Sequence, residues 1–330
     1  MKQLKFLMFI LLAAAMLSCN STNEPESGDN LHWEFVSRLS GITYALTVAN
    51  NGDVWVSNYY RDLVLYVLYL STDNGHTWFT KGTFSDSPTA VAISPVNGYI
   101  FAGTEHNLFR STDNGGSWES IAENVNVWDI LVMPSGEIYV AAYYSRGVYY
   151  SNDNGDTWIL KGNGISNANA TSLALGVDGT LYAGTSYRGV YRSTNGGDSW
   201  IAASNYNDVL IRSLAVADDG SIFAAARGSG IIKSTDRGAT WNLIKSRFSF
   251  DYTYKIIYNT VTKHLFIRSV VYNPAAVSKI YRSTDLGANW EFADAGLPDM
   301  PIYELAFNTH TGQTFVATGG GLYKVRSYPK

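Results

Sequence analysis

The chain has 330 residues, of which 14% are aromatic, 16% are charged and 30 are glycine. This composition favours β structure with tight turns over helices. The net charge of −4 provides no basic field for nucleic acid, so we do not expect a nucleic-acid-binding protein. No apolar run after the N-terminal segment approaches the length that spans a membrane.

The segment 1–18 has the pattern of a secretory signal. Lys2 and Lys5 form a short positive region, and an apolar run follows as far as Ala15. The single cysteine, Cys19, stands where cleavage is expected. Residues 16–19, Met-Leu-Ser-Cys, resemble the lipobox of bacterial lipoproteins, which usually has Leu at the first of these positions. The resemblance implies that Cys19 is acylated and becomes the first mature residue. The alternative is an ordinary signal peptide followed by a free thiol.

Residues 19–30 contain no side chain suited to a core. We expect a flexible tether here, with a reach of roughly 18 Å as a coil. Its acids, Glu24, Glu26 and Asp29, resemble the surface-export tags of Bacteroidota lipoproteins, although any solvated linker has a similar composition. The expected location is therefore the cell envelope, as an outer-membrane lipoprotein that is periplasmic or surface-exposed. The lipid anchor is then its only contact with the membrane.

An octapeptide of the pattern Ser-x-Asp-x-Gly-x-x-Trp occurs six times in residues 31–330, at spacings of 40 to 49 residues. Periods of this size are typical of propellers and solenoids. The third position holds Asp73, Asp113, Asp153, Asn195, Asp236 and Asp285. We expect these side chains to accept hydrogen bonds from turn amides, a structural role that an amide also fills. The Gly supplies an unusual φ, and the Trp packs between blades.

The segments between the octapeptides repeat as well. In chain order, each unit has an apolar strand such as 90–93 or 172–175, then a turn, then a second strand such as 181–185 or 222–224. A variable loop and a third strand such as 189–192 follow, and the Trp opens a fourth. Residues 303–325 supply three strands without an octapeptide, and residues 32–36 supply a fourth strand alone. The sequence therefore predicts an all-β, seven-bladed β-propeller over 31–330, closed by the N-terminal strand.

The octapeptide resembles the Asp-box (BNR) repeat of sialidases, xyloglucan-cleaving endoglucanases, sortilin-type receptors and photosystem II assembly factors. The resemblance covers nearly all of residues 31–330, and the unit 181–193 is most similar to the xyloglucanase and assembly-factor repeats. It implies a propeller, a fold that serves enzymes and receptors alike. Sialidases of this type carry an Arg-Ile-Pro-like motif that is missing here. Xyloglucanases of this type place their cleft between two propellers, whereas this chain has one.

We expect the ligand site on the face opposite the octapeptide turns, where variable loops join the second and third strands and lead into the first. Residues 57–70 and 268–280 are expected to be extended loops. Tyr and Arg are enriched in recognition surfaces. The candidate ligand-binding residues are Tyr59, Tyr60, Arg61, His106, Trp128, Tyr143, Tyr144, Arg146, Tyr187, Arg188, Arg227 and Tyr272.

Three of these candidates fall at similar positions in consecutive repeats. Arg146, Arg188 and Arg227 predict a basic arc around the channel that binds an anionic group through guanidinium forks. The alternative is that each arginine pairs with a neighbouring acid. The candidates for acid–base chemistry on the same face are Asp62, Glu105, Asp129, Asp208, Asp251 and Glu304, with hydrogen bonding to loop amides as the favoured alternative.

No His/Cys cluster has metal-ligand spacing, so we expect neither a metal nor a cofactor. The expected function is a non-catalytic recognition or assembly module, a monomeric propeller that binds a glycan or an envelope protein on its Tyr/Arg-rich face. The alternatives are a sialidase- or xyloglucanase-like glycoside hydrolase, a glycan-binding accessory protein, and a structural scaffold.

Overall fold

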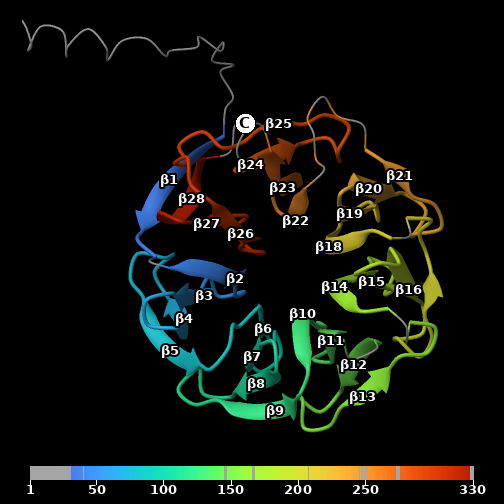
Figure 1. Cartoon of the computed structure of the whole chain (residues 1–330), viewed down its shortest axis with the longest axis horizontal. Coiled ribbons are helices and arrows are strands. Elements are labelled where there is room, and N and C mark those ends of the chain that lie inside the picture. The colour runs from blue at the N-terminus through green and yellow to red at the C-terminus, as the bar shows by residue number, and fades with distance from the viewer. Residues whose placement is uncertain are drawn as a thin grey trace, which may run out of the picture. The chain divides into compact units, whose positions relative to one another are not determined.

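The computed structural model describes residues 31–327, apart from residues 40, 145–146, 166–167, 207, 245, 247, 249, 251 and 273–275. In this part of the chain, seven four-stranded antiparallel sheets surround a central channel (Figure 1). The predicted all-β, seven-bladed propeller is thus confirmed. The predicted signal peptide, Cys19 and the tether lie outside the described residues. The described part contains no helix long and apolar enough to cross a bilayer.

Each blade is built from strands that are consecutive in the chain, with the first strand innermost and the fourth outermost. Blade 1 consists of β2 (Ile42–Val48), β3 (Val54–Tyr60), β4 (Leu65–Ser71) and β5 (Phe79–Phe84). Blade 2 consists of β6 (Ala90–Ile93), β7 (Ile100–Gly103), β8 (Asn107–Ser111) and β9 (Glu119–Glu123). Blade 3 consists of β10 (Asn126–Val132), β11 (Ile138–Tyr143), β12 (Gly147–Ser151) and β13 (Ile159–Lys161).

The second half of the ring follows the same plan. Blade 4 consists of β14 (Ala170–Leu175), β15 (Leu181–Thr185), β16 (Val190–Ser193) and β17 (Ile201–Ala202). Blade 5 consists of β18 (Leu210–Val216), β19 (Ile222–Arg227), β20 (Gly230–Ser234) and β21 (Asn242–Leu243). Blade 6 consists of β22 (Thr253–Asn259), β23 (His264–Tyr272), β24 (Ala276–Ser283) and β25 (Glu291–Phe292). Blade 7 combines β26 (Ile302–Phe307), β27 (Thr314–Thr318) and β28 (Gly321–Ser327) with β1 (His32–Ser37).

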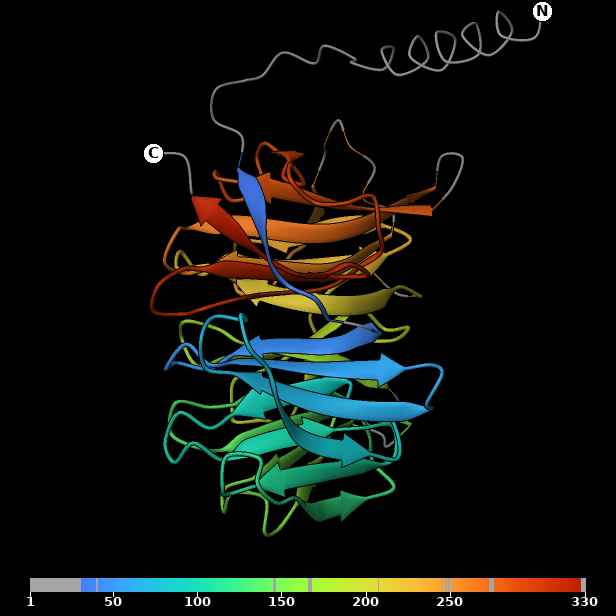
Figure 2. The same cartoon turned by 90° about the vertical axis from the view of Figure 1, so that its left-hand side faces the viewer.

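The ring closes through β1, which pairs antiparallel with β28 and forms the outer edge of blade 7. Figure 2 shows this N-terminal strand, in blue, against the red strands of the C-terminal end. Trp33 lies opposite Val325 and is 1% exposed. Its indole Nε1 donates to the carbonyl oxygen of Ala293 in blade 6 at 2.5 Å. The predicted closure by the N-terminal strand is therefore confirmed, and no covalent loop maintains it.

Hydrogen bonds within each octapeptide hold the turn between the third and fourth strands. In blade 2, the Ser111 hydroxyl accepts from the Gly115 amide at 2.8 Å and donates to Asp113 at 2.8 Å. Asp113 also accepts from the amide and the hydroxyl of Ser117, at 2.8 and 2.7 Å. In blade 4, Asn195 accepts from the Ser199 amide at 3.0 Å and donates to the Ser199 hydroxyl at 2.9 Å. An amide thus reproduces the carboxylate's contacts.

These turns predict a loss of stability in acid. Hydrogen bonds from the residue four positions further on lower the pKa of Asp113, Asp153 and Asp236 to about 2, below the ordinary 3.8. A carboxyl with a lowered folded pKa stabilises the fold when it is ionised, so its contribution is present above pH 4 and is lost as the pH falls towards 2. We expect the melting temperature of the protein to fall steeply across this window.

The control is a triple variant, Asp113→Asn with Asp153→Asn and Asp236→Asn, measured by circular dichroism from pH 6 to pH 2. Its melting temperature should depend less on pH, because amides do not titrate. His264, whose pKa burial and then Arg282 lower to about 4, is common to both proteins and cancels in the comparison. Parallel pH curves for the two proteins would show that these carboxylates do not control acid stability.

Two predictions about loops are wrong. Paired strands occupy most of residues 57–70 and the described part of 268–280: Tyr59 pairs with Tyr66 across β3 and β4, and β23 pairs with β24 as far as Tyr272 opposite Ala276. Runs of Tyr, Val and Leu extend these strands because their side chains pack on one another, as the stacked Tyr59 and Tyr66 rings do at 4.7 Å. Trp128 and Asp129, predicted in a loop, lie within β10.

Candidate functional site: the channel mouth

The innermost strands place one side chain each at the mouth of the channel by means of β-bulges. A register shift near the start of the strand occurs in six of the seven inner strands that the structure describes. A bulge adds one residue to the strand and redirects its side chain. The added residues, all of which line a channel cavity of about 1340 Å³, are Tyr44, Trp128, Thr171, Arg212, Tyr254 and Tyr303.

Three arginines surround one of these rings. The guanidinium carbon Cζ lies 4.8 Å from the Tyr254 ring centroid in Arg268, 5.7 Å in Arg212 and 5.8 Å in Arg227. Arg212 and Arg227 come from β18 and β19 of blade 5, and Arg268 comes from β23 of blade 6. The quadrupole of an aromatic ring attracts cations to its face. Tyr254 therefore holds three positive charges together, and we call this group the arginine cluster.

Trp128 extends the cluster towards blade 3. Its ring is stacked on Tyr143, from the neighbouring strand β11, with centroids 4.8 Å apart and an interplanar angle of 15°. Arg212, which reaches across from blade 5, has its Cζ 5.0 Å from the Trp128 centroid. Trp128 thus lies between a tyrosine and a guanidinium. On this side of the mouth, the rings of Trp128 and Tyr254 contact guanidinium groups and hold them in place. Their faces are therefore not free for a ligand.

Positive charge predominates in the arginine cluster, and the Glu304 carboxylate attracts Arg268 only from a distance. Among the described residues, no carboxylate forms an ion pair with Arg212, Arg227 or Arg268. The Nε atoms of Arg212 and Arg268 are buried and donate to no described acceptor. Burial, followed by repulsion from Arg227, lowers the pKa of Arg212, and burial also lowers the pKa of Arg268. A buried donor without a partner destabilises the fold, so an acceptor that reaches these guanidinium groups would be stabilising.

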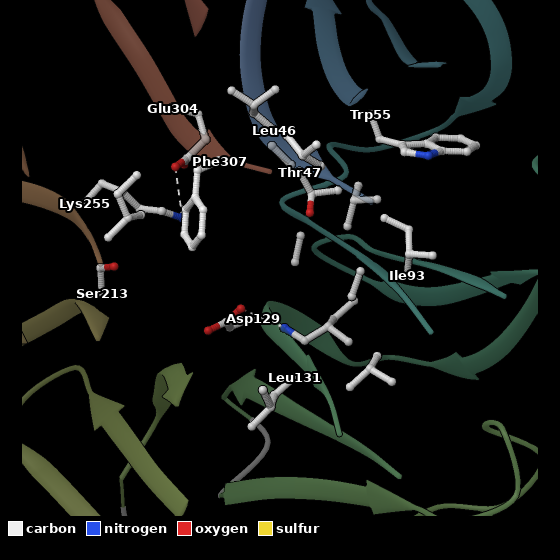
Figure 3. A pocket seen from close by; sticks show the side chains of 18 of the residues that line it. Leu46, Thr47, Trp55, Ile93, Asp129, Leu131, Ser213, Lys255, Glu304 and Phe307 are labelled. Carbon is white, nitrogen blue, oxygen red and sulfur yellow. Dashed lines mark hydrogen bonds and ion pairs between the residues drawn. The ribbon is translucent and has the colours of Figure 1, made fainter. Parts of the chain in front are cut away.

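A second layer of charge lies deeper in the channel. The Lys255 ammonium contacts the Glu304 carboxylate at 2.9 Å, and Figure 3 shows this pair facing Asp129 on another wall. Burial lowers the pKa of Lys255, but attraction to Glu304 and then to Asp129 outweighs it and leaves the pKa above its usual value. Apolar side chains that include Leu46, Ile93 and Phe307 line the channel further in.

Asp129 has its two oxygens engaged by the backbone. One accepts from the Ile130 amide at 2.9 Å, and the other accepts from the Leu173 amide at 2.8 Å, which joins blade 3 to blade 4. Burial is the main cause that raises the pKa of this carboxyl. Glu304 likewise accepts from the Leu305 amide at 3.0 Å in addition to its ion pair. Asp129 and Glu304 thus act as hydrogen-bond acceptors for backbone amides of the inner strands.

The predicted arginine arc stays a prediction, because Arg146 lies outside the described residues, as does the acid candidate Asp251. Arg188 is exposed beside Tyr187, which is 64% exposed. Arg227 lies with Arg212 and Arg268 around Tyr254. The exposed candidates on the same face include Tyr144, at 75%, and Tyr272, at 57%.

The remaining candidates are distributed around the mouth. Tyr59, Tyr60, Arg61 and Asp62 belong to the β3–β4 hairpin, and Glu105 and His106 belong to the turn before β8. The His106 Nδ1 atom contacts the Asp86 carboxylate at 2.7 Å. Asp208 precedes β18 with a φ of 63°, and its amide donates to the Tyr187 carbonyl at 2.8 Å. No group of three or more His, Cys, Asp and Glu side chains in the described chain has a metal-binding arrangement.

Arg212, Arg268 and Tyr254 were absent from the sequence candidates. Arg268 pairs with Lys255 in the second strand of its blade. The equivalent positions of the other blades all hold small residues, which are Ser57, Gly103, Ala141, Gly184, Ala225 and Ala317. Among these positions, Arg268 alone is large, and it donates through Nη1 to the Tyr303 carbonyl of blade 7. An alignment of the seven repeats would reveal Arg268 as a candidate, because this arginine stands alone in a column of small residues.

Comparisons with known proteins support the fold. No protein-family model matches the sequence, and the search of curated proteins found no match. A structure of YCF48 bound to D1 peptide is 15% identical, with a TM-score of 0.68 over 91% of this chain and 96% of that one. The GH74 xyloglucanase from Xanthomonas campestris is 15% identical, with a TM-score of 0.65 over 89% of this chain and 53% of its own.

Virginiamycin B lyase from Staphylococcus aureus is 14% identical, with a TM-score of 0.70 over 90% of this chain and 98% of that one. This chain spans about half of the xyloglucanase. A protein bound to a peptide, a xyloglucanase and a lyase are thus alike in structure, which at these identities establishes the propeller fold and leaves the activity to the residues of the site.

Proposed function

We propose that this protein is a non-catalytic recognition module of the cell envelope, anchored through Cys19, which binds an acidic polypeptide segment of an envelope protein at the channel mouth. The arginine cluster carries this proposal. Three guanidinium groups meet at Tyr254 without a described carboxylate partner, and two of them have buried Nε donors. Carboxylates bind to arginine through charge-assisted hydrogen bonds, which are stronger than neutral ones.

The geometry favours a peptide over a neutral glycan at this position. A sugar ring that packs on an aromatic side chain needs a free ring face. Trp128 lies between Tyr143 and Arg212, and Tyr254 is surrounded by guanidinium groups. The YCF48 structure, a propeller bound to D1 peptide, supports the idea that such a ring accommodates a polypeptide ligand.

A glycoside hydrolase needs an acid and a second carboxylate free to act on the scissile bond. The acids that line the described channel cavity are Asp53, Asp129 and Glu304. Asp53 accepts from the Asn51 amide group at 2.8 Å, and backbone amides or Lys255 engage the other two. No free pair is left in this wall, so binding without hydrolysis is the better proposal.

The strand order shows on which face of the ring the chain that follows the proposed anchor enters the propeller. The fourth strand of every blade starts on the face that carries the octapeptide turns, and β1 is the fourth strand of blade 7. The chain therefore enters the propeller on that face, opposite the mouth. The proposed tether is therefore joined to the ring on the octapeptide face and not at the mouth.

The test is a fluorescence-anisotropy titration of the chain from Asn20 onward, which contains every strand of the ring. Labelled hexaglutamate should bind at least tenfold more tightly than labelled hexaglutamine, and the affinity should weaken as NaCl rises from about 50 to about 300 mM, because salt screens the attraction. Polygalacturonate and xyloglucan are tested in parallel for competition and for release of reducing sugar. Equal affinity for both peptides overturns the proposal, and sugar release identifies a hydrolase instead.

A further inference from the structure

The two sides of the channel mouth carry opposite charge. The arginine cluster occupies blades 5 and 6, and Figure 1 shows the inner strands of these blades, β18 and β22, across the channel from β2 and β6 of blades 1 and 2. On that opposite side, the hairpin turn of blade 1 carries Asp62, and the corresponding turn of blade 2 carries Glu105. A ligand that crosses the mouth therefore meets cations at one end and anions at the other.

Three tyrosine rings lie together in blade 1, on this side of the mouth. The Tyr59 and Tyr66 rings are stacked at 4.7 Å, and the Tyr44 ring lies 6.4 and 6.3 Å from them. Tyr44 is a bulge residue of β2 that lines the channel cavity and is 38% exposed. We call this group the tyrosine ledge. Aromatic faces next to a carboxylate are the usual surroundings of a bound organic cation.

The Glu105 carboxylate acts electrostatically on two tyrosines of the ledge. The pKa of Tyr44 is raised by burial, then by Tyr59 and by Glu105, and the pKa of Tyr66 is raised by burial, then by the other two tyrosines and Glu105. A negative charge close to a phenol opposes its ionisation. This agrees with the place of Glu105 in the turn before β8, in the blade next to the ledge.

The charges of this side do not cancel among themselves. Asp86 is paired with His106 at 2.7 Å. Arg61, the cation of the blade 1 turn, adjoins Asp62 in the chain and partly opposes the rise in the pKa of Tyr44 that burial, Tyr59 and Glu105 cause. Glu105 is exposed and forms no ion pair or hydrogen bond with a described residue. One carboxylate beside three aromatic rings is thus left for an external cation.

We propose that the tyrosine ledge and Glu105 form a second subsite, which takes a lysine or arginine side chain of the same polypeptide segment whose acidic group binds the arginine cluster. This inference rests on the proposed function and defines the ligand further. The bound segment is dipolar, and it lies across the channel in one direction, with its acidic end over blades 5 and 6 and its basic end over blades 1 and 2. Complementary charges of this kind set the register and orientation of a complex.

The probes are labelled peptides with two glutamates at one end and two lysines at the other, separated by Gly-Ser spacers of graded length. In the matched peptides, glutamine replaces both lysines. For the spacer that matches the span, the dipolar peptide should bind about fivefold to tenfold more tightly than the acid-only peptide. Glu105→Gln and Tyr44→Leu should each remove this advantage and leave the acid-only affinity within twofold. The control, Glu137→Gln, makes the same charge change in the turn between β10 and β11 and should keep the advantage.

The outcomes separate the two proposals. If the acid-only peptide binds and the lysines add nothing at any spacer length, the ledge subsite is wrong and the arginine site stands. If the advantage survives in both Glu105→Gln and Tyr44→Leu, the lysines bind elsewhere, and the subsite is equally wrong. If neither peptide binds the unchanged protein, and circular dichroism shows that this protein is folded, the recognition function itself is overturned, and this inference with it.

Discussion

Replacing Trp33 by alanine is expected to lower the free energy of unfolding by about 4 kcal/mol, the usual cost of removing a fully buried tryptophan. Trp33 is 1% exposed and is packed at the junction of blades 6 and 7, with its ring 6.4 Å from Phe266. The change leaves a cavity there and removes the hydrogen bond to Ala293. Equilibrium urea denaturation followed by tryptophan fluorescence and circular dichroism measures the loss.

The position of Trp33 gives this substitution a further consequence for the ring. β1 is joined to β28 only by strand pairing, so a weakened β1 opens the ring and exposes the edge of blade 7. The matched control is Phe35→Ala, in the same strand, because Phe35 is 52% exposed. It should cost less than about 1 kcal/mol. Equal losses in the two variants would contradict the closing role of Trp33.

Replacing Arg212 and Arg268 together by glutamine is expected to weaken hexaglutamate binding about 100-fold without lowering the melting temperature. Each charge-assisted hydrogen bond contributes about 1.5–3 kcal/mol, so the loss of two accounts for this factor. Stability should be retained because the removal of two partly buried charges, whose Nε atoms have no described acceptor, offsets the loss of the Arg268 hydrogen bond to the Tyr303 carbonyl. The measurements are anisotropy titration at several salt concentrations and differential scanning calorimetry.

The control for this experiment makes the same change in net charge away from the mouth. Arg237→Gln with Arg326→Gln replaces two exposed arginines, and hexaglutamate affinity should change less than threefold. The salt dependence of binding should also become shallower only in the Arg212 and Arg268 variant. If the two double variants lose affinity equally, general attraction by the protein surface explains the binding, and the arginine cluster is not the site.

The local parts of the structure follow from the sequence because their contacts are local. Each octapeptide contains both the acceptor and the donors of its turn, as Asp113 and Ser117 show, so the pattern alone locates the hairpin. The regular spacing of the octapeptides and the incomplete units at both ends determine the number of blades and the closing strand. These features need no knowledge of how the blades face one another.

The composition of the site was decided by the tertiary structure. Arg212, Tyr254 and Arg268 are far apart in the sequence and come from two blades, and no octapeptide or loop marks them. Arg212 and Tyr254 enter the channel at bulges near the start of β18 and β22. A register shift of this kind cannot be recognised from an alternating sequence pattern. The long hairpins were mistaken for loops because cross-strand packing of the tyrosines, rather than turn chemistry, extends them.

The sequence by itself thus determined the repeat, the strand order and the closure of the ring, since hydrogen bonds within short segments and strand pairing specify them. The structure alone decided that Arg227 joins Arg212 and Arg268 around Tyr254. The physical reason is that the attraction between a guanidinium and an aromatic face depends on close approach, here 4.8 to 5.8 Å across blades, which only the packing of the ring establishes.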